Sequence, residues 1–306
     1  MTVTDEAPMR DVTTPSSSVS VVIPARNESA SIGAVVAGLR ARLPDAEIIV
    51  VDDASDDDTA ALATAQGARV VWHRYQKGNG AAVKSGVRAA TRRVLVLMDG
   101  DGQHDPADVP PLLAALAADV DMVVGARDAA SQASVPRLIA NSLYNRMASW
   151  ITGHRVEDLT SGFRAVDIAR FREFLSLLPN GFSYPTTITM AFFRAGYTVT
   201  YMPIKAGRRT GRSHLKPLRD GLKFLLIIFK VGTLYSPLKL FVPVALLEGL
   251  VGFSYYLYTF LEYSRFTNMS ALLLASAVTT FLMGLISEQI TALLYKQDPR
   301  SDTPEA

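Results

Sequence analysis

The sequence predicts an α/β protein in which helices cover both faces of a mostly parallel sheet, followed by a C-terminal two-helix transmembrane hairpin. Three observations support this fold class. Short β-branched runs alternate with helix-like runs from residue 18 to residue 127, and such alternation favours βαβ units. Polar side chains recur where the predicted strands end. Two long apolar runs fill most of residues 238–295, and each is long enough to cross a bilayer.

Five strands and four helices are expected before the hairpin. Runs rich in Val and Ile predict the strands, and apolar spacing near 3.6 residues predicts the helices between them. Asn27 or Ser29 is suited to cap the first helix. The expected strands are residues 18–24, 47–53, 68–74, 93–99 and 121–127, and the expected helices are residues 28–43, 56–68, 79–92 and 106–117.

Composition excludes several classes of protein. The chain has 306 residues, no cysteine and a formal net charge of +2. A disulfide framework and a thiolate zinc site are therefore excluded, and an intracellular setting fits. The charge gives no reason to expect a nucleic-acid partner. Residues 1–17 are polar and lack an apolar core, so we expect a disordered tail and not a signal peptide.

Polar residues that follow the strands are expected to share one edge of the sheet. Open parallel sheets bind ligands beyond the carboxyl ends of their strands. The residues found there are Arg26, Asn27 and Glu28 after the first strand, Asp52 and Asp53 after the second, Asp99 and Asp101 after the fourth, and Arg127 after the fifth. This edge is the candidate site.

The run LMDGDGQHDP, residues 97–106, carries a chemical signal. Mg²⁺ and Mn²⁺ take oxygen ligands from one or two carboxylates together with substrate phosphates, and a departing diphosphate needs such a cation. Asp99 and Asp101 supply two carboxylates, Gln103 offers a neutral oxygen, and Gly100 lets the backbone approach a ligand closely. In isolation, the same residues favour an ordinary glycine-rich turn.

A second glycine-rich run, KGNGAAVKSG, covers residues 77–86. It is not a P-loop, because Val83 precedes the Lys-Ser pair where a Walker A motif requires Gly. Two interpretations stay open for it: a loop at a helix start near a bound donor, or a plain turn.

Five motifs together resemble a known family. They are VVIPARNE (21–28), VVDDASDDDT (50–59), LMDGDGQ (97–103), VGAR (124–127) and DLTSGFRA (158–165). In this order they resemble family 2 glycosyltransferases of the GT-A fold, and most of all the polyprenyl-phosphate sugar synthases of the dolichyl-phosphate mannose synthase group. The resemblance covers about residues 18–216 and extends to members that carry two C-terminal spans.

The resemblance implies a role for each matching residue. Donor-binding residues would be Pro24, Arg26, Glu28, Asp53, Asp99, Gly100, Asp101, Arg127, Arg208 and His214. The metal, Mg²⁺ or Mn²⁺, would be held by Asp99, Asp101 and Gln103, the acceptor phosphate by Arg127, Arg164 and Arg208, and the catalytic residues would be Asp101 and Arg164. Two positions depart from the family pattern: Arg26 stands where an aromatic residue is common, and His214 where Lys is usual.

The reaction implied is transfer of one sugar from a nucleotide-diphospho-sugar to a polyprenyl phosphate, with inversion. A phosphate monoester is already a nucleophile near neutral pH, since its second pKa is about 6. It needs arginines to position it and no general base. His104 is the obvious candidate base beside the acidic motif, and the alternative for it is a residue that begins a helix or supports the metal site.

The C-terminal part predicts a membrane anchor. Spans are expected at about 238–261 and 269–295, within a hairpin over 237–296, and the alternative is a pair of buried core helices. Basic residues precede and follow the hairpin, which predicts a catalytic domain and both termini in the cytoplasm. Residues 211–236 predict an interfacial amphipathic helix, after a catalytic domain over 18–210, and residues 297–306 a cytoplasmic tail.

Two other functions compete with this one. A processive polysaccharide synthase of this fold carries a Gln-X-X-Arg-Trp motif, and neither Trp72 nor Trp150 lies in one. An inactive membrane-tethered scaffold would not need the acids at 99 and 101. Hairpin-anchored enzymes often associate through their spans, so a homo-oligomer is also expected.

Overall fold

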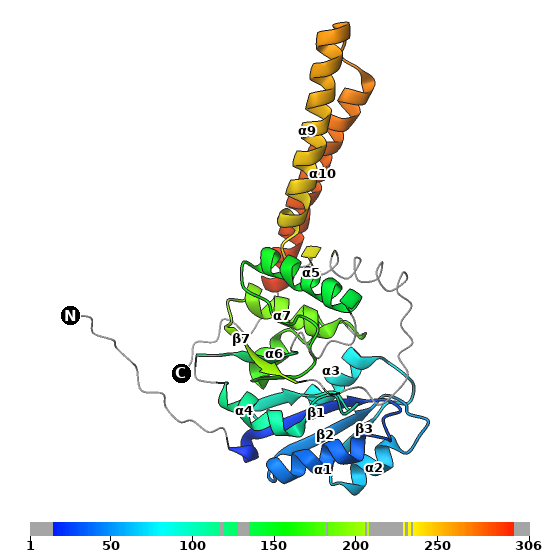
Figure 1. The fold of residues 1–306 in the computed structure, drawn as a ribbon, viewed down its shortest axis with the longest axis vertical. Coiled ribbons are helices and arrows are strands. Elements are labelled where there is room, and N and C mark those ends of the chain that lie inside the picture. Colours follow the sequence, from blue (N-terminus) through cyan, green and yellow to red (C-terminus); the bar gives the residue numbers. More distant parts are fainter. Residues whose placement is uncertain are drawn as a thin grey trace, which may run out of the picture. The chain divides into compact units, whose positions relative to one another are not determined.

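Seven strands form one sheet in the described part of the chain (Figure 1). The structure is a computed structural model that describes residues 15–116, 119–127, 135–181, 183–205, 207, 229, 232–233 and 235–296, without side chains at 135–141 and 294–296. The strand order is β3-β2-β1-β4-β6-β5-β7. All described pairs are parallel except those of β6, which runs antiparallel to both β4 and β5. The predicted mostly parallel α/β sheet is therefore confirmed.

The strands and helices alternate as the sequence predicts over its first half. The strands are β1 (Val19–Ala25), β2 (Glu47–Asp52), β3 (Arg69–Trp72), β4 (Val94–Leu97), β5 (Met122–Arg127), β6 (Arg164–Asp167) and β7 (Val199–Ile204). The α-helices of the catalytic part are α1 (Ile32–Arg42), α2 (Thr59–Ala65), α3 (Asn79–Ala89), α4 (Val109–Ala114), α5 (Val135–Thr152), α6 (Ile168–Glu173) and α7 (Tyr184–Arg194). Short 3₁₀ turns, η1 (Ser16–Ser18) and η2 (Pro106–Asp108), precede β1 and α4.

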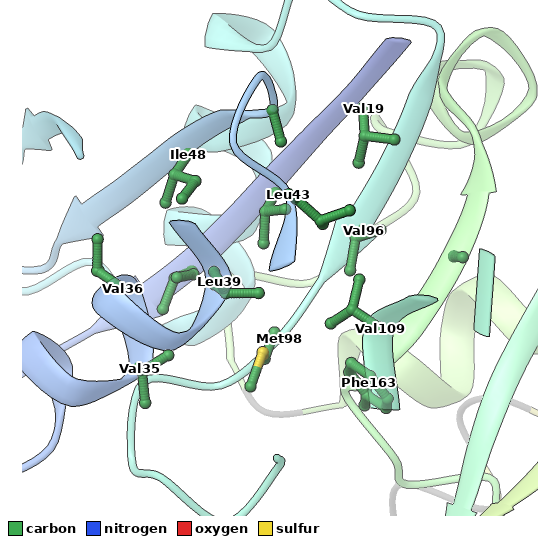
Figure 2. Packing of buried hydrophobic residues seen from close by; sticks show 14 of the residues in the cluster. Val19, Val35, Val36, Leu39, Leu43, Ile48, Val96, Met98, Val109 and Phe163 are labelled. Carbon is green, nitrogen blue, oxygen red and sulfur yellow. The ribbon is translucent and has the colours of Figure 1, made fainter. Parts of the chain in front are cut away.

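One face of the sheet packs against α1, α2 and α4. Val35, Val36 and Leu39 of α1 are at most 4% exposed and lie over the β1–β2 part of the sheet (Figure 2). Phe163, which directly precedes β6, belongs to the same apolar cluster and lies beside Val109 of α4 (Figure 2). This core therefore reaches from the first strands to the segment that enters β6.

The other face packs against α3 at very short range. A Cβ atom on Gly86 would lie 2.2 Å from Val22 Cγ1 of β1 and 3.1 Å from Val51 Cγ2 of β2. The helix can approach the two central strands this closely because residue 86 has no side chain. Helix α3 and the η2–α4 side thus enclose the sheet from both faces.

Two long apolar helices, α9 (Pro237–Tyr263) and α10 (Asn268–Lys296), belong to a second compact unit with residues 144–156 (Figure 1). Both helices are long and apolar enough to cross a membrane, and only 11% and 17% of their most apolar windows are buried. Buried core helices would be covered, so this alternative is wrong. Gly252 lets the helices approach closely, because a Cβ there would lie 2.9 Å from Leu273 Cβ.

Carboxylates inside the hairpin face protein. Glu248 of α9 accepts hydrogen bonds from Ser276 (3.2 Å) and Thr280 (3.0 Å) of α10. Glu288 of α10 accepts one from the backbone N–H of Leu238 at 3.4 Å. Each acid therefore accepts hydrogen bonds from the other helix of the hairpin, as a carboxylate in an apolar helix requires.

Replacing Gly86 by Ala is expected to destabilise the protein by about 1–3 kcal/mol, because the added methyl overlaps two strand side chains. The apparent midpoint of thermal unfolding of the full chain in detergent measures this. Gly33→Ala in α1 is the matched control, since nothing lies within 4 Å of a Cβ at that position. The control is expected to be neutral or slightly stabilising, and equal midpoints for the two variants would contradict the packing described.

Candidate active site

The loops after β1 and β2 are joined by hydrogen bonds. Asn27 N donates to Ser55 Oγ (3.0 Å), and Asp56 N donates to Asn27 Oδ1 (2.9 Å). Glu28 N donates to Thr59 Oγ1 at 2.9 Å. Asn27 has a φ of 55°, a left-handed conformation that Asn tolerates. The predicted nucleotide-pocket residues of these two loops are therefore held at one edge of the sheet.

Pro24, Arg26 and Glu28 follow one another at this edge. Pro24 is buried within β1 opposite Val51 of β2, Arg26 is exposed, and Glu28 is half-buried. Only Arg26 of the three is exposed. Their contacts with a nucleotide stay a prediction.

Asp53 is buried and hydrogen-bonded to neighbouring protein groups. It is 4% exposed; its Oδ1 accepts from Lys77 N (2.8 Å) and lies 2.7 Å from His73 Nδ1, and its Oδ2 accepts from Gly78 N (2.8 Å). His73 Nε2 in turn lies 2.8 Å from Ser85 Oγ. Burial by itself raises the pKa of Asp53, but these hydrogen bonds outweigh it and lower the pKa. Both carboxylate oxygens of Asp53 therefore already have protein partners, and its role in donor binding stays a prediction.

The glycine-rich run at 77–86 forms the loop before α3 and the first two turns of that helix. Gly78 has a φ of 102°, and the next backbone donors, Gly80 N and Ala81 N, are bonded to Gly181 O (3.2 Å) and Asn180 O (3.1 Å). These helix-start donors are occupied by carbonyls. The run therefore lies at a helix start, as the first of the two interpretations has it, and its closeness to a bound donor stays a prediction.

The acidic loop after β4 is fixed by its neighbours. Ser31 Oγ donates to Gly100 O at 2.7 Å, which ties the loop to the start of α1. Gln103 N donates to Asp101 Oδ1 at 3.1 Å, and Gln103 O accepts from Gly207 N at 2.8 Å. Gly102, with a φ of 72°, makes the turn between them. The loop that carries the predicted metal ligands is therefore tied by hydrogen bonds to the start of α1 and to Gly207.

Asp99 lies against the segment that precedes β6. Arg164 pairs with Leu97 of β4 and with Val124 of β5, so the antiparallel β6 begins at the edge where those strands end. A Cβ on Gly162 would lie 2.9 Å from Asp99 Oδ2 and 3.2 Å from the Tyr184 hydroxyl. The Ser-Gly-Phe segment and the first acid of the motif thus meet although more than 60 residues separate them.

The surroundings of Asp99 favour a bound cation. Burial raises the pKa of Asp99; His104 opposes this, the charge of Asp101 adds to it, and Arg127 and Arg164 oppose it. A carboxylate whose ionised form is costly gains most from a cation. Within the residues that the structure describes, no group of three or more His, Asp and Glu could hold a metal. Two carboxylates and an amide fit Mg²⁺ or Mn²⁺, which complete their coordination with water and substrate phosphates.

Arg127 is held in place by Asp158. Its Nε and one terminal nitrogen donate to the two oxygens of Asp158 at 2.8 and 3.0 Å, and that terminal nitrogen also donates to Thr160. Asp158 is 5% exposed. Burial alone would raise the pKa of Asp158, but the bond and charge of Arg127, with backbone bonds, lower it. The Arg127 side chain is still 28% exposed, so it can reach a ligand.

Arg164 is buried completely. Its relative exposure is 0%, and its guanidinium donates to Ser161 O, to Thr189 Oγ1 (3.2 Å) and to Pro185 O (3.3 Å). This geometry argues against the expected direct contact with an acceptor phosphate and against a catalytic role by contact. Arg164 joins the segment before β6 to α7, while no partner for its Nε is found among the described residues.

His104 is buried against Phe163. It is 5% exposed, its ring stacks on Phe163 with centroids 5.1 Å apart, and no partner for its Nδ1 is found among the described residues. A base must reach the proton it takes. His104 therefore supports the acidic loop and the core, which favours the second of the two interpretations that the sequence left open.

Two predicted residues, Arg208 and His214, lie outside the described residues, as does most of the predicted interfacial helix at 211–236. Sequence reasoning missed two features that the structure shows at the site: Asp158 as the holder of Arg127, and the Tyr184 hydroxyl, which lies with Asp99 beside Gly162. Asp158 lies in the same DLTSGFRA motif as Arg164, and this proximity is the signal that could have identified the Arg127 partner.

The fold and this site define a nucleotide-sugar transferase of the GT-A class. Residues 20–175, just over half of the chain, match the family model described as Glycosyl transferase family 2. Residues 236–293 match the model described as GtrB C-terminal hairpin. The chain belongs to glycosyl transferase family 2 and is a glycosyltransferase.

Several relatives with named activities are similar over much of the chain. Glycosyltransferase AglJ of Haloferax volcanii is 28% identical over 302 residues, which cover 94% of this chain and 98% of AglJ. The dolichyl-phosphate hexose transferase of the same organism is 33% identical over 70% of this chain and 93% of its own length. The polyprenol monophosphomannose synthase of Mycolicibacterium smegmatis is 32% identical over 62% of this chain and 77% of its own.

A solved structure shares the fold. Glucosyl-3-phosphoglycerate synthase from Mycobacterium tuberculosis, in complex with Mn²⁺, uridine diphosphate and phosphoglyceric acid, superposes with a TM-score of 0.58. It is 22% identical, and the match covers 70% of this chain and 78% of that one. This likeness supports the fold assignment alone.

Removing the Asp158 charge is expected to destabilise the protein most at neutral pH. Asp158→Asn should cost about 1–3 kcal/mol. Because the pKa of Asp158 is lowered below its ordinary value of 3.8, its contribution is present above that value and is lost as pH falls toward the folded pKa. Thermal unfolding from pH 7 into acid should show the gap to wild type closing. Asp56→Asn, an exposed acid, is the control, and a gap that stays constant with pH would contradict the ion pair's role.

Replacing Asp99 by Asn is expected to leave the metal-free protein at least as stable as wild type at pH 7. A raised folded-state pKa means that ionised Asp99 lowers stability as pH rises through that value, and Asn removes this loss. The variant should also lose the increase in thermal midpoint that Mn²⁺ gives the wild type. Thermal unfolding with Mn²⁺ and with chelator measures both. A variant that is clearly less stable and still stabilised by Mn²⁺ would contradict this account.

Proposed function

We propose that this glycosyltransferase transfers a single sugar from a nucleotide-diphospho-sugar to a polyprenyl phosphate at the cytoplasmic membrane surface. The proposal rests on the presence of two features in one chain. One is the acidic loop with Asp99 and Asp101, which is suited to a nucleotide-diphospho-sugar, and the other is the apolar hairpin of α9 and α10, which is mostly exposed. Relatives named for polyprenol, dolichyl-phosphate and undecaprenyl-phosphate substrates support the acceptor class. Basic residues on either side of the hairpin support the cytoplasmic orientation.

The reaction needs positioning more than proton transfer. A phosphate oxygen of the acceptor attacks the anomeric carbon of the sugar, the bond from that carbon to the diphosphate oxygen breaks, and the nucleoside diphosphate leaves. Attack opposite the leaving group inverts the anomeric configuration. The acceptor phosphate is already ionised near neutral pH, so no base is required, in keeping with the burial of His104.

Each charged group then has a defined task. Asp99, Asp101 and Gln103 would hold Mg²⁺ or Mn²⁺, which when bound offsets the charge that builds on the departing diphosphate. Arg127, oriented by Asp158 and partly exposed, binds a phosphate of donor or acceptor. Arg164 positions the segment that faces Asp99. These groups are set before the ligands arrive, so little reorganisation is left for the reaction.

The function is tested with purified full-length protein in lipid nanodiscs, polyprenyl phosphate, labelled nucleotide sugars with uracil or guanine bases, and Mg²⁺ or Mn²⁺. The expected result is a lipid-linked sugar that depends on the cation. Asp101→Asn should lower the rate at least about 100-fold, since an electrostatic contact to a reacting charge is worth that much.

Asp105→Asn is the matched control in the same loop. Asp105 is exposed and caps the next turn through a bond from Ala107 N, and Asn caps equally well. The control should keep wild-type activity. No lipid-linked sugar from any donor, or equal rates for the two variants, would overturn the proposal. Cation-dependent nucleotide binding without transfer would favour the scaffold, and a polymeric product would favour a polysaccharide synthase.

A further inference from the structure

Helix α5 presents an apolar and basic face to solvent. Leu143 is 59% and Trp150 52% exposed, and Arg146 between them is exposed as well. Positions 143, 146 and 150 lie on one side of a helix. The outer face of a helix on a water-facing surface is normally polar, so this one is exceptional.

The opposite side of α5 is already the packed one. Tyr144 and Ala148 are 4% exposed and Ile151 is 3% exposed. These residues, again at helical spacing, account for the burial that holds α5 in place. Leu143 and Trp150 therefore do not contribute to the packing that holds α5 within the described part of the chain. Their exposed surface can contact lipid or another molecule.

The C-terminal end of α5 is fixed at the start of the first span. Within the second unit, Lys239 Nζ donates to the backbone oxygen of Ile151 at 2.7 Å. No Lys or Arg occurs between Lys239 and Arg265, so Lys239 marks the level at which α9 enters the bilayer. Trp150 precedes Ile151 directly and therefore lies near that level.

We propose that the face of α5 formed by Leu143, Arg146 and Trp150 rests on the membrane, at the boundary of headgroups and acyl chains. Tryptophan concentrates at this boundary, because its ring is apolar and its N–H is polar. Arg146 can place its guanidinium among lipid phosphates while its stem covers apolar surface. The bilayer is the occupant because Trp150 adjoins Ile151, whose carbonyl oxygen binds Lys239 at the start of the first candidate span.

The chain is well suited to a direct test, because it contains only two tryptophans, Trp72 and Trp150. Trp72 is the last residue of β3 and is 66% exposed, and Trp72→Phe leaves Trp150 as the single reporter. The full-length variant is placed in nanodiscs whose acyl chains carry bromine near the headgroup. Trp150 emission should fall by at least about twofold relative to unbrominated lipid and resist aqueous iodide. The Trp150→Phe chain, which keeps Trp72, should show no lipid quenching.

A third variant tests whether the hairpin inserts into the bilayer, independently of the position of α5. Phe253 lies within α9 and is 54% exposed; Phe253→Trp in a chain without Trp72 and Trp150 reports insertion of the hairpin. If this tryptophan is quenched by lipid and Trp150 is not, the anchor stands and the proposal for α5 is overturned. If lipid quenches neither tryptophan, both the membrane insertion of the hairpin and the proposal for α5 are overturned. The emission of Trp150 could instead shift to the blue as the number of protein copies per disc rises, without quenching by lipid. That result would identify a second copy of the chain as the occupant and would also overturn the proposal for α5.

Discussion

Strand β6 runs against both of its neighbours, and the candidate site depends on this reversal. Strands β4 and β5 end at the ligand edge, and a parallel strand between them would begin at the opposite edge. The reversed β6 begins at the ligand edge instead, so residues 158–163 are delivered there. Gly162 then lies against the Asp99 carboxylate, and Asp158 reaches Arg127. A main-chain direction thus determines which charges meet.

The charged side chains of the site differ in how deeply they are buried and in what they bind. Asp158 and Arg164 are buried and satisfied largely by protein groups, so they support their neighbours. Arg127 is paired on one side and exposed on the other. Asp99 lies where burial makes its ionised form costly, a condition that a divalent cation relieves. Fixed dipoles and charges of this kind favour a transition state in which charge moves onto a diphosphate.

Much of this was predictable from the sequence. Strands β1 to β5 were predictable because strands of a parallel sheet form continuous apolar runs. The position of Asp99 and Asp101 at the end of a strand was predictable as well. Strand β6 was not, since four residues that begin and end with a charge, Arg164 and Asp167, show no strand period. The polar side chains of Arg164 and Asp53 suggest ligand binding. In the structure they bond to backbone groups and to the side chains of Thr189 and His73, and no motif reveals these partners.

The measurement that tests the central claim most directly is cation-dependent binding of nucleoside diphosphate to Gly162→Ala, by calorimetry with UDP and with GDP in the presence of Mn²⁺. The added methyl would lie 2.9 Å from Asp99 Oδ2 and must displace that carboxylate. Gly181→Ala, where nothing lies within 4 Å of the new methyl, is the control. The account predicts that Gly162→Ala weakens binding at least about tenfold, a loss of about 1.4 kcal/mol, while the control binds as wild type does. Equal binding by both variants would contradict it.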